Sequence, residues 1–244
     1  MGISAVWAHA SGWLDIRELD DGRYELRGRA RDRKVHVPHS PCVMDYPIEL
    51  IGLIFESFGP IFTCDEIARD IDGSEAALDV QHSVQAYFQD SIFSRPVKIL
   101  DYGCGGGSSS IALAKLFPKA SVVGVDFAGG LLEIARGRAK HHGMPNLHFE
   151  VVPENGRRFA GEYDFVFLNA VYEHLLPGER QVVLGGVWSA LKRDGILFLN
   201  QTPHRWFPVE AHTSGLPLIN YLPKSLALMA MRKFCKRSIA QASC

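Results

Sequence analysis

The chain has 244 residues, 47% of them hydrophobic and 22% charged, which is the composition of a globular protein and a length for one large or two small domains. The formal net charge is −1 at pH 7, so no overall positive field indicates a nucleic-acid partner. The scattered cysteines lack the spacing of a zinc or redox motif and favour reduced thiols in a cytoplasmic protein. The sequence predicts neither a signal peptide nor a membrane span, which needs about 20 apolar residues.

Residues 1–95 are expected to form an accessory or lid region of hairpin and helices. Apolar residues on both sides of an Asp-Asp-Gly turn predict a β-hairpin over residues 12–28. A basic, proline-broken connector follows it. Three helices are then predicted from apolar spacing: one over 46–59, a second with Thr63 as its N-cap, and a third over about 74–91.

Residues 96–244 change to apolar strands that alternate with helices, which is the pattern of a parallel sheet built from βαβ units. Short connections and right-handed crossovers predict a Rossmann-like, doubly wound α/β fold, with a mostly parallel sheet and helices on both faces. The predicted strands are 97–102, 121–126, 147–152, 163–169 and 195–201, and the predicted helices are 107–117, 129–142 and 177–192.

The sequence ILDYGCGGGSSSIALA, residues 99–114, runs from a buried strand into a glycine-rich turn that opens a helix. Gly103, Gly105 and Gly107 lack a Cβ, so the backbone can turn tightly and approach a ligand while helix N–H groups point at it. Asp101 ends the strand, and its carboxylate would repel a pyrophosphate but attract a sulfonium or ammonium group. The turn is therefore predicted to bind a nucleoside-like ligand with positive charge near Asp101.

Asp126 ends the second strand, about 20 residues after the glycine turn, the position from which a carboxylate binds both ribose hydroxyls in nicotinamide-binding folds. Phe127, next to it, is expected to lie against an adenine ring. The alternative role for Asp126 is the N-cap of the helix over 129–142, and one side chain can serve both roles.

The order ILDYGCGGG, VVGVDF, YDFVFLNAVYEHL and LKRDGILFLNQTPH resembles the seven-stranded class I S-adenosylmethionine-dependent methyltransferase family over about residues 95–205. The resemblance implies that the glycine turn approaches the methionine end of the cofactor, that the acid after the second strand binds ribose, and that residues 169–174 line the site. After the third strand the family commonly has an acid for the adenine, whereas this chain has Pro153, Glu154 and Asn155. The cofactor-binding residues implied are Asp101, Gly103, Gly105, Gly107, Asp126, Phe127, Asn155 and Asn169.

His174 is the candidate catalytic residue. Methyl transfer from a sulfonium is an in-line displacement that depends mostly on positioning, and a base is needed only where the nucleophile must lose a proton. His174 follows the fourth strand at the ligand edge, and its ordinary pKa of about 6.5 suits proton transfer. The alternative is a histidine with local contacts only. The expected function is methyl transfer to an oxygen, nitrogen or carbon nucleophile of a small-molecule acceptor.

Two other functions stay open. Gly103-x-Gly105 followed by Ser108, with Asp126 as the ribose acid, approximates the fingerprint of a nicotinamide-dependent oxidoreductase. The second alternative is a degenerate fold that binds a nucleoside or a partner protein without turnover.

The residues after 201 predict no pair of strands to complete a seven-stranded sheet. An exposed edge strand would favour a homodimer or cover from the N-terminal region. The loop over 202–217 is expected to recognise the acceptor, and its His204, Glu210 and His212 lack the spacing of a metal site, so no metal is predicted. The basic tail, with Leu226, Leu228 and Met231 on its apolar side, is a candidate for contact with a membrane surface or an anionic acceptor.

Overall fold

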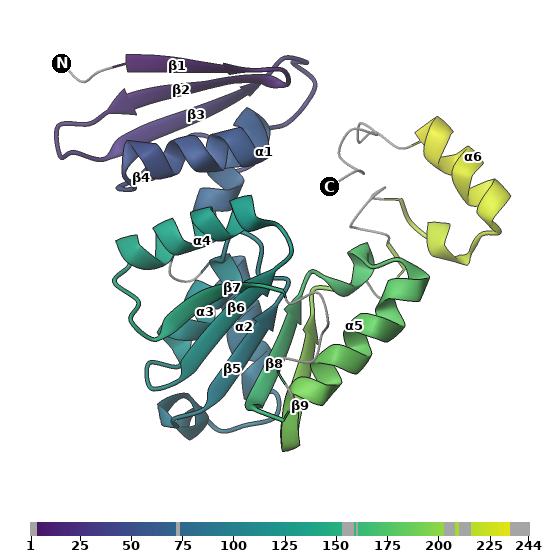
Figure 1. Ribbon diagram of the computed structural model, residues 1–244. Coiled ribbons are helices and arrows are strands. Elements are labelled where there is room, and N and C mark those ends of the chain that lie inside the picture. Colours follow the sequence, from purple (N-terminus) through teal and green to yellow (C-terminus); the bar gives the residue numbers. More distant parts are fainter. Residues whose placement is uncertain are drawn as a thin grey trace. The chain divides into compact units, whose positions relative to one another are not determined.

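The computed structural model describes residues 4–71, 74–152, 159, 161–202, 208–209 and 216–234. The chain divides into two compact units, residues 1–200 and 201–244. The first unit contains a four-stranded antiparallel sheet, drawn in purple and blue in Figure 1, and a five-stranded parallel sheet drawn in teal and green. Asn155, His204, Glu210 and His212 lie outside the described residues.

The antiparallel sheet has the strand order β1-β2-β3-β4. The predicted hairpin is confirmed as β2 and β3, in which Leu14 pairs with Gly28 and Ile16 with Leu26. Leu14, Ile16 and Leu26 are buried against the helix that follows, because alternate residues of a strand face one side of its sheet. Two outer strands were not predicted. The strands are β1 (Ser4–His9), β2 (Gly12–Glu18), β3 (Tyr24–Ala30) and β4 (Cys42–Met44).

The two predicted N-terminal helices form one interrupted helix, α1 (Ile48–Ala68). The interruption is at Gly59, whose backbone angles are φ 67° and ψ 173°, and Pro60 follows it. The prediction that Thr63 caps the second segment is wrong. Because Pro60 already lies within the helix, Thr63 is inside it, and its buried hydroxyl donates to the Gly59 carbonyl oxygen at 2.8 Å.

The third N-terminal helix is shorter than predicted. α2 (Glu75–Gln85) begins after Ser74, whose side chain accepts a hydrogen bond from the Ala77 N–H. The chain leaves the α-helix after Gln85 and makes a short 3₁₀ helix, η1 (Asp90–Ser94), before the parallel sheet begins.

The five predicted strands of the parallel sheet are present, in the order β7-β6-β5-β8-β9. All four neighbouring pairs are parallel. The order reverses between β5 and β8, and in such sheets ligands bind at the carboxyl ends of the strands beside this reversal. β9 begins four residues earlier than predicted because it follows α5 directly. The strands are β5 (Lys98–Tyr102), β6 (Ser121–Asp126), β7 (Leu147–Val151), β8 (Tyr163–Asn169) and β9 (Leu191–Asn200).

Helices cover both faces of this sheet, as predicted, and each face has its own apolar core. On one face Ile99 and Val122 pack with residues of α2, α3 (Ser108–Leu116) and α4 (Gly129–His141). On the other face Leu100 and Val166 pack with Val183 and Val187 of α5 (Pro177–Ala190). Strands buried on both faces are nearly continuous apolar runs, which is why the sequence predicts them well.

The second unit, taken by itself, contains a bridge between Val209 and Pro217, the 3₁₀ helix η4 (Ile219–Tyr221) and α6 (Lys224–Phe234). No side chain of α6 is buried. Among the residues the structure describes, the parallel sheet has five strands, and β9 is paired only on its β8 side. No helix within the described ranges has the length and hydropathy to cross a bilayer.

Candidate functional site

The glycine turn between β5 and α3 has the backbone that only glycine adopts easily. Gly103, Gly105 and Gly107 have φ values of 76°, 51° and 85°, all in the left-handed region. The N–H groups of Gly103 and Cys104 donate to the Val125 carbonyl oxygen at 2.8 and 3.0 Å. The predicted tight turn is therefore present, and these bonds attach it to the end of β6.

Asp101 is buried beneath this turn with three donors around its carboxylate. Its side chain is 1% exposed, and the hydroxyls of Ser109 and Ser110 each donate to Oδ2 at 2.6 Å. The Asn169 amide donates to Oδ1 at 3.2 Å. Burial raises the pKa of Asp101, and these hydrogen bonds lower it in part. The three hydrogen bonds favour the carboxylate form, whereas burial and the Asp126 charge oppose it.

The hydrogen bonds continue from Asp101 along the carboxyl ends of the strands. The Asn200 amide of β9 donates to the Asn169 side-chain oxygen at 2.9 Å and to the Ser83 hydroxyl of α2 at 3.2 Å. Asn200 and Ser83 are not among the residues expected at the site from the sequence. Asn169 and Asn200 are opposite each other at the ends of two neighbouring buried strands. A polar residue at the end of each strand is the sequence signal that could have identified Asn200.

Asp126 binds the backbone on both sides of the site. Its Oδ2 accepts the Gly105 N–H at 2.9 Å, and its Oδ1 accepts the Ala128 N–H at 2.8 Å at the start of α4. The alternative that Asp126 is the N-cap of α4 is wrong, because Ala128 is the N-cap residue and Asp126 accepts the N–H of that residue instead. A carboxylate oxygen has two lone pairs, so each oxygen keeps one for a ligand hydroxyl.

Phe127 stands exposed beside the turn. Its side chain is 64% exposed, and its ring lies edge-on to the buried Tyr102 ring with 6.3 Å between centroids. An aromatic ring with an open face next to a glycine turn offers a stacking surface for a planar base.

The segment after β8 packs directly on the glycine turn. A Cβ on Gly103 would lie 2.6 Å from Val171 Cγ2, so only glycine allows this approach. Ala170 has a φ of 53°, a left-handed conformation that costs a residue with a Cβ about 1 kcal/mol or more. Strained backbone of this kind gathers at functional sites. The segment leads into the 3₁₀ helix η3 (Tyr172–His174).

His174 is therefore held near the ligand edge of the sheet, as its position in the sequence predicts. Its side chain is 46% exposed, and its Nε2 is 4.0 Å from Glu173 Oε1. The Arg180 guanidinium lies 4.7 Å from the centre of the Tyr172 ring and donates to the Leu175 carbonyl oxygen at 3.0 Å. These contacts attach the segment that carries His174 to the start of α5. Among the described residues, no group of three or more potential metal ligands lies together.

The sequence from β5 to β9 matches known proteins. Residues 99–195 match the family model described as a methyltransferase domain. A malonyl-[acyl-carrier protein] O-methyltransferase of Bacillus cereus is 29% identical over 61% of this chain and 56% of its own length. The mitochondrial ubiquinone biosynthesis O-methyltransferase of Saccharomyces cerevisiae is 31% identical over 64% of this chain and 47% of its own length.

A trans-aconitate 2-methyltransferase of Deinococcus radiodurans is 32% identical over 41% of this chain and 36% of its own length. The chain thus spans about half the length of the curated relatives it matches, or less. The matched residues include the glycine turn, Asp126 and the segment after β8. The match therefore favours a methyltransferase over a nicotinamide-dependent oxidoreductase. Residues 99–195 are therefore similar to the methyltransferase domain of class I S-adenosylmethionine-dependent enzymes.

Proposed function

We propose that the chain binds S-adenosylmethionine at the carboxyl ends of β5 and β6 and transfers its methyl group to a small-molecule acceptor. The observation that carries this proposal is the buried Asp101 carboxylate beside Gly105, whose Cβ position has no atom within 4 Å. A carboxylate below an open backbone turn attracts a positively charged ligand and leaves room for it. The residues of the site fit this cofactor, which supplies a methyl group activated by its sulfonium charge.

Each described residue of the site has a distinct role in this proposal. Asp101 provides negative charge near the methionine end, and the glycine turn brings the backbone close to the ligand. Asp126 accepts hydrogen bonds from the two ribose hydroxyls with its remaining lone pairs, and Phe127 stacks on the adenine. Asn169 holds Asp101 in place through the hydrogen bond to Oδ1. Asn155, the proposed adenine contact, lies outside the described residues and stays a prediction.

Of the three types of nucleophile considered for the acceptor, oxygen, nitrogen and carbon, we favour oxygen. The Bacillus cereus and Saccharomyces cerevisiae relatives are both named O-methyltransferases, and their acceptors are chemically unlike one another. Fold and family do not determine the acceptor, so its identity comes from the segment after β8 and from parts of the chain beyond the described residues.

The compartment, the oligomeric state and the boundary at residue 95 also remain proposals. Cys42, Cys64 and Cys104 are free thiols, which supports a reducing compartment such as the cytoplasm. β9 has a partner strand on one side only among the described residues, and a second copy of the chain could cover that edge. Residues 1–95 and 96–244 contain the antiparallel and the parallel sheet respectively, which supports the proposed division.

Calorimetric titration with S-adenosylmethionine and S-adenosylhomocysteine tests the cofactor assignment. Wild type is expected to bind both in the micromolar range, and Asp126→Ala is expected to weaken binding about 100-fold, because hydrogen bonds to a charged group contribute about 1.5–3 kcal/mol each. Asp164→Ala is the matched control. Its carboxylate also accepts a backbone N–H, that of Lys98, but it lies at the opposite end of the sheet.

The control variant should bind as wild type does. No binding by well-folded wild type would contradict the proposed function. Binding in wild type without turnover on any acceptor of the three nucleophile classes would instead support the degenerate alternative.

His174→Gln tests the catalytic assignment. The variant is expected to keep its affinity for S-adenosylhomocysteine and, once an acceptor is in hand, to lose turnover by about 100-fold or more, the usual contribution of a general base. His148→Gln, at an exposed position on β7, is the control and should leave turnover unchanged. Equal turnover in His174→Gln and wild type would show that His174 has local contacts only.

A further inference from the structure

A buried arginine of α4 lies behind the glycine turn. Arg138 is fully buried, and its Nη1 donates to the Gly106 carbonyl oxygen at 3.0 Å and to the Ser108 hydroxyl at 2.7 Å. A Cβ on Gly106 would lie 3.3 Å from Nη1, whereas the Cβ position of Gly105 is open. Arg138 therefore contacts the turn on the side away from the open face at Gly105.

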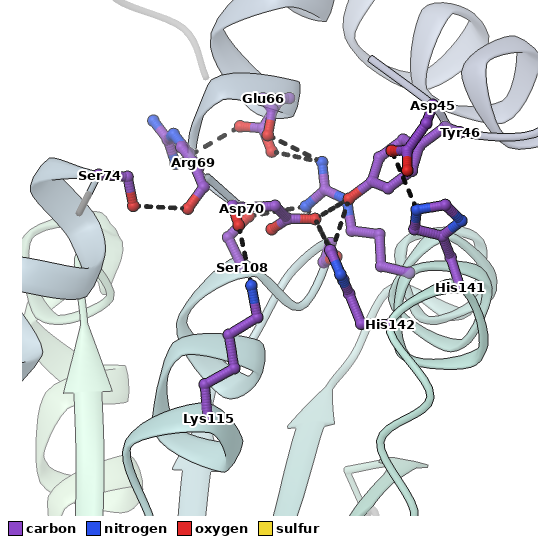
Figure 2. Close-up of polar contacts among 12 residues, drawn as sticks. Asp45, Tyr46, Glu66, Arg69, Asp70, Ser74, Ser108, Lys115, His141 and His142 are labelled. Atoms are coloured by element: carbon purple, nitrogen blue, oxygen red, sulfur yellow. Dashed lines mark hydrogen bonds and ion pairs between the residues drawn. The ribbon is translucent and has the colours of Figure 1, made fainter. Parts of the chain in front are cut away.

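The other two nitrogens of Arg138 contact Glu66, near the end of α1, and Asp70, two residues after that helix ends. Nη2 donates to the Glu66 carbonyl oxygen at 3.0 Å and is 3.6 Å from Glu66 Oε2, and Nε is 3.4 Å from Asp70 Oδ2. One guanidinium thus joins the glycine turn to the end of α1, which lies about 40 residues earlier in the sequence. In Figure 2, dashed lines mark the contacts of the Glu66 and Asp70 side chains with the guanidinium.

Asp70 is itself anchored by further contacts. The Tyr46 hydroxyl donates to Asp70 Oδ2, and His142 Nε2 lies 3.7 Å from the same oxygen (Figure 2). Burial raises the pKa of Asp70, but the nearby His142, the Arg138 charge and the hydrogen bond from Tyr46 together bring it below its ordinary value. Asp70 is therefore a fixed negative charge for Arg138.

These contacts have a mechanical consequence for the turn. A buried guanidinium is tolerated only when opposite charge compensates its own, so the Glu66 and Asp70 carboxylates determine where it lies. The fork of an arginine is planar and rigid, and its nitrogens cannot move independently. A shift of Glu66 or Asp70 would consequently move Nη1, and with it the Gly106 carbonyl and the start of α3.

We propose that Arg138 is a positioning residue for the cofactor, oriented by Glu66 and Asp70, so that the N-terminal region sets the affinity of the glycine turn. The inference rests on the proposed function, since it assumes that the turn binds S-adenosylmethionine. Coupling of this kind is reciprocal: cofactor bound at the turn also stabilises the end of α1.

The test combines ligand affinity with amide hydrogen exchange measured by mass spectrometry. Arg138→Lys keeps the charge between the two carboxylates but loses the fork. It is expected to weaken S-adenosylhomocysteine binding about tenfold and to speed exchange over residues 103–110 in the absence of ligand. In wild type, the same ligand is expected to slow exchange over residues 60–70. Arg136→Lys is the control, because Arg136 also lies on α4 and donates to a backbone carbonyl, that of Phe149.

The control should match wild type in both measurements. A folded Arg138→Lys variant with wild-type affinity and wild-type exchange over 103–110 would overturn the positioning role. If Arg138→Lys does not fold, Glu66→Gln gives the second test: it keeps the Glu66 backbone contact, and unchanged affinity in it overturns the proposal. Wild type that binds neither S-adenosylmethionine nor S-adenosylhomocysteine overturns the proposed function itself, a different result from binding that survives in the variants.

Discussion

Asp101→Asn is expected to weaken S-adenosylmethionine binding about 100-fold while leaving the chain folded. The substitution keeps the shape of the side chain, and the new amide can donate to the Ser109 and Ser110 hydroxyls, which also accept hydrogen bonds. Only the negative charge is lost. Because that charge lies in a buried site, where screening by water is weak, we expect a loss in affinity of about 100-fold.

The same variant should become more stable than wild type as the pH rises. The pKa of Asp101 in the folded chain is raised, first by burial, so the unfolded chain releases this proton at a lower pH than the folded chain does. Wild-type stability therefore falls as the pH rises from about 3.8 through the folded pKa, and Asp101→Asn avoids that loss. Denaturant unfolding of both proteins across this pH range measures the difference.

Asp70→Asn is the control, because the pH dependence of stability that Asp70 causes is expected to have the opposite sign. The pKa of Asp70 is lowered in the folded chain, so its contribution to stability is present above pH 3.8 and is lost as the pH falls through the folded pKa. This variant should be less stable than wild type at neutral pH. A pH dependence of the same sign in both variants, or Asp101→Asn that binds S-adenosylmethionine as wild type does, would contradict the role of Asp101.

The parallel sheet could be predicted from sequence because its strands are short apolar runs bounded by turns, and because both faces are buried. The outer strands of the antiparallel sheet carried no such signal. β1 is rich in alanine and contains an exposed Val6, and β4 has only three residues. Their pairing is decided by contact with β2 and β3 rather than by their own side chains.

Part of the site could likewise be predicted from the sequence, and part of it could not. Asp101, Gly103, Gly105, Gly107 and Asp126 could be named because each stands at a strand end or in the turn next to one, where position alone implies nearness to a ligand. The hydrogen bonds from Arg138 to the turn could not be predicted. They depend on α1 and α4 packing side by side, a contact between segments far apart in sequence, and a single arginine within a helix is usually a solvated residue.

Substitutions at two glycines of the same turn are expected to separate binding from folding. Gly105→Ala places a methyl group in open space on the ligand side, with a φ of 51°, so the cost in stability is limited to about 1–2 kcal/mol of backbone strain. The methyl group would occupy the approach of the cofactor. We therefore expect a folded variant whose affinity for S-adenosylhomocysteine is lower by about 100-fold.

Gly107→Ala is expected to affect mainly the stability of the fold. Its methyl carbon would lie 2.8 Å from the Ala135 Cβ and 3.0 Å from the Ala135 Cα of α4, and backbone cannot move aside as the end of a flexible side chain can. Strain from a φ of 85° adds to this overlap, so a loss of about 3 kcal/mol or more in unfolding free energy is expected. Urea unfolding and calorimetric titration of both variants distinguish the two roles. Equal losses of stability at the two positions would mean that the turn is a structural element only, since a ligand-facing glycine must tolerate the added methyl group when no ligand is present.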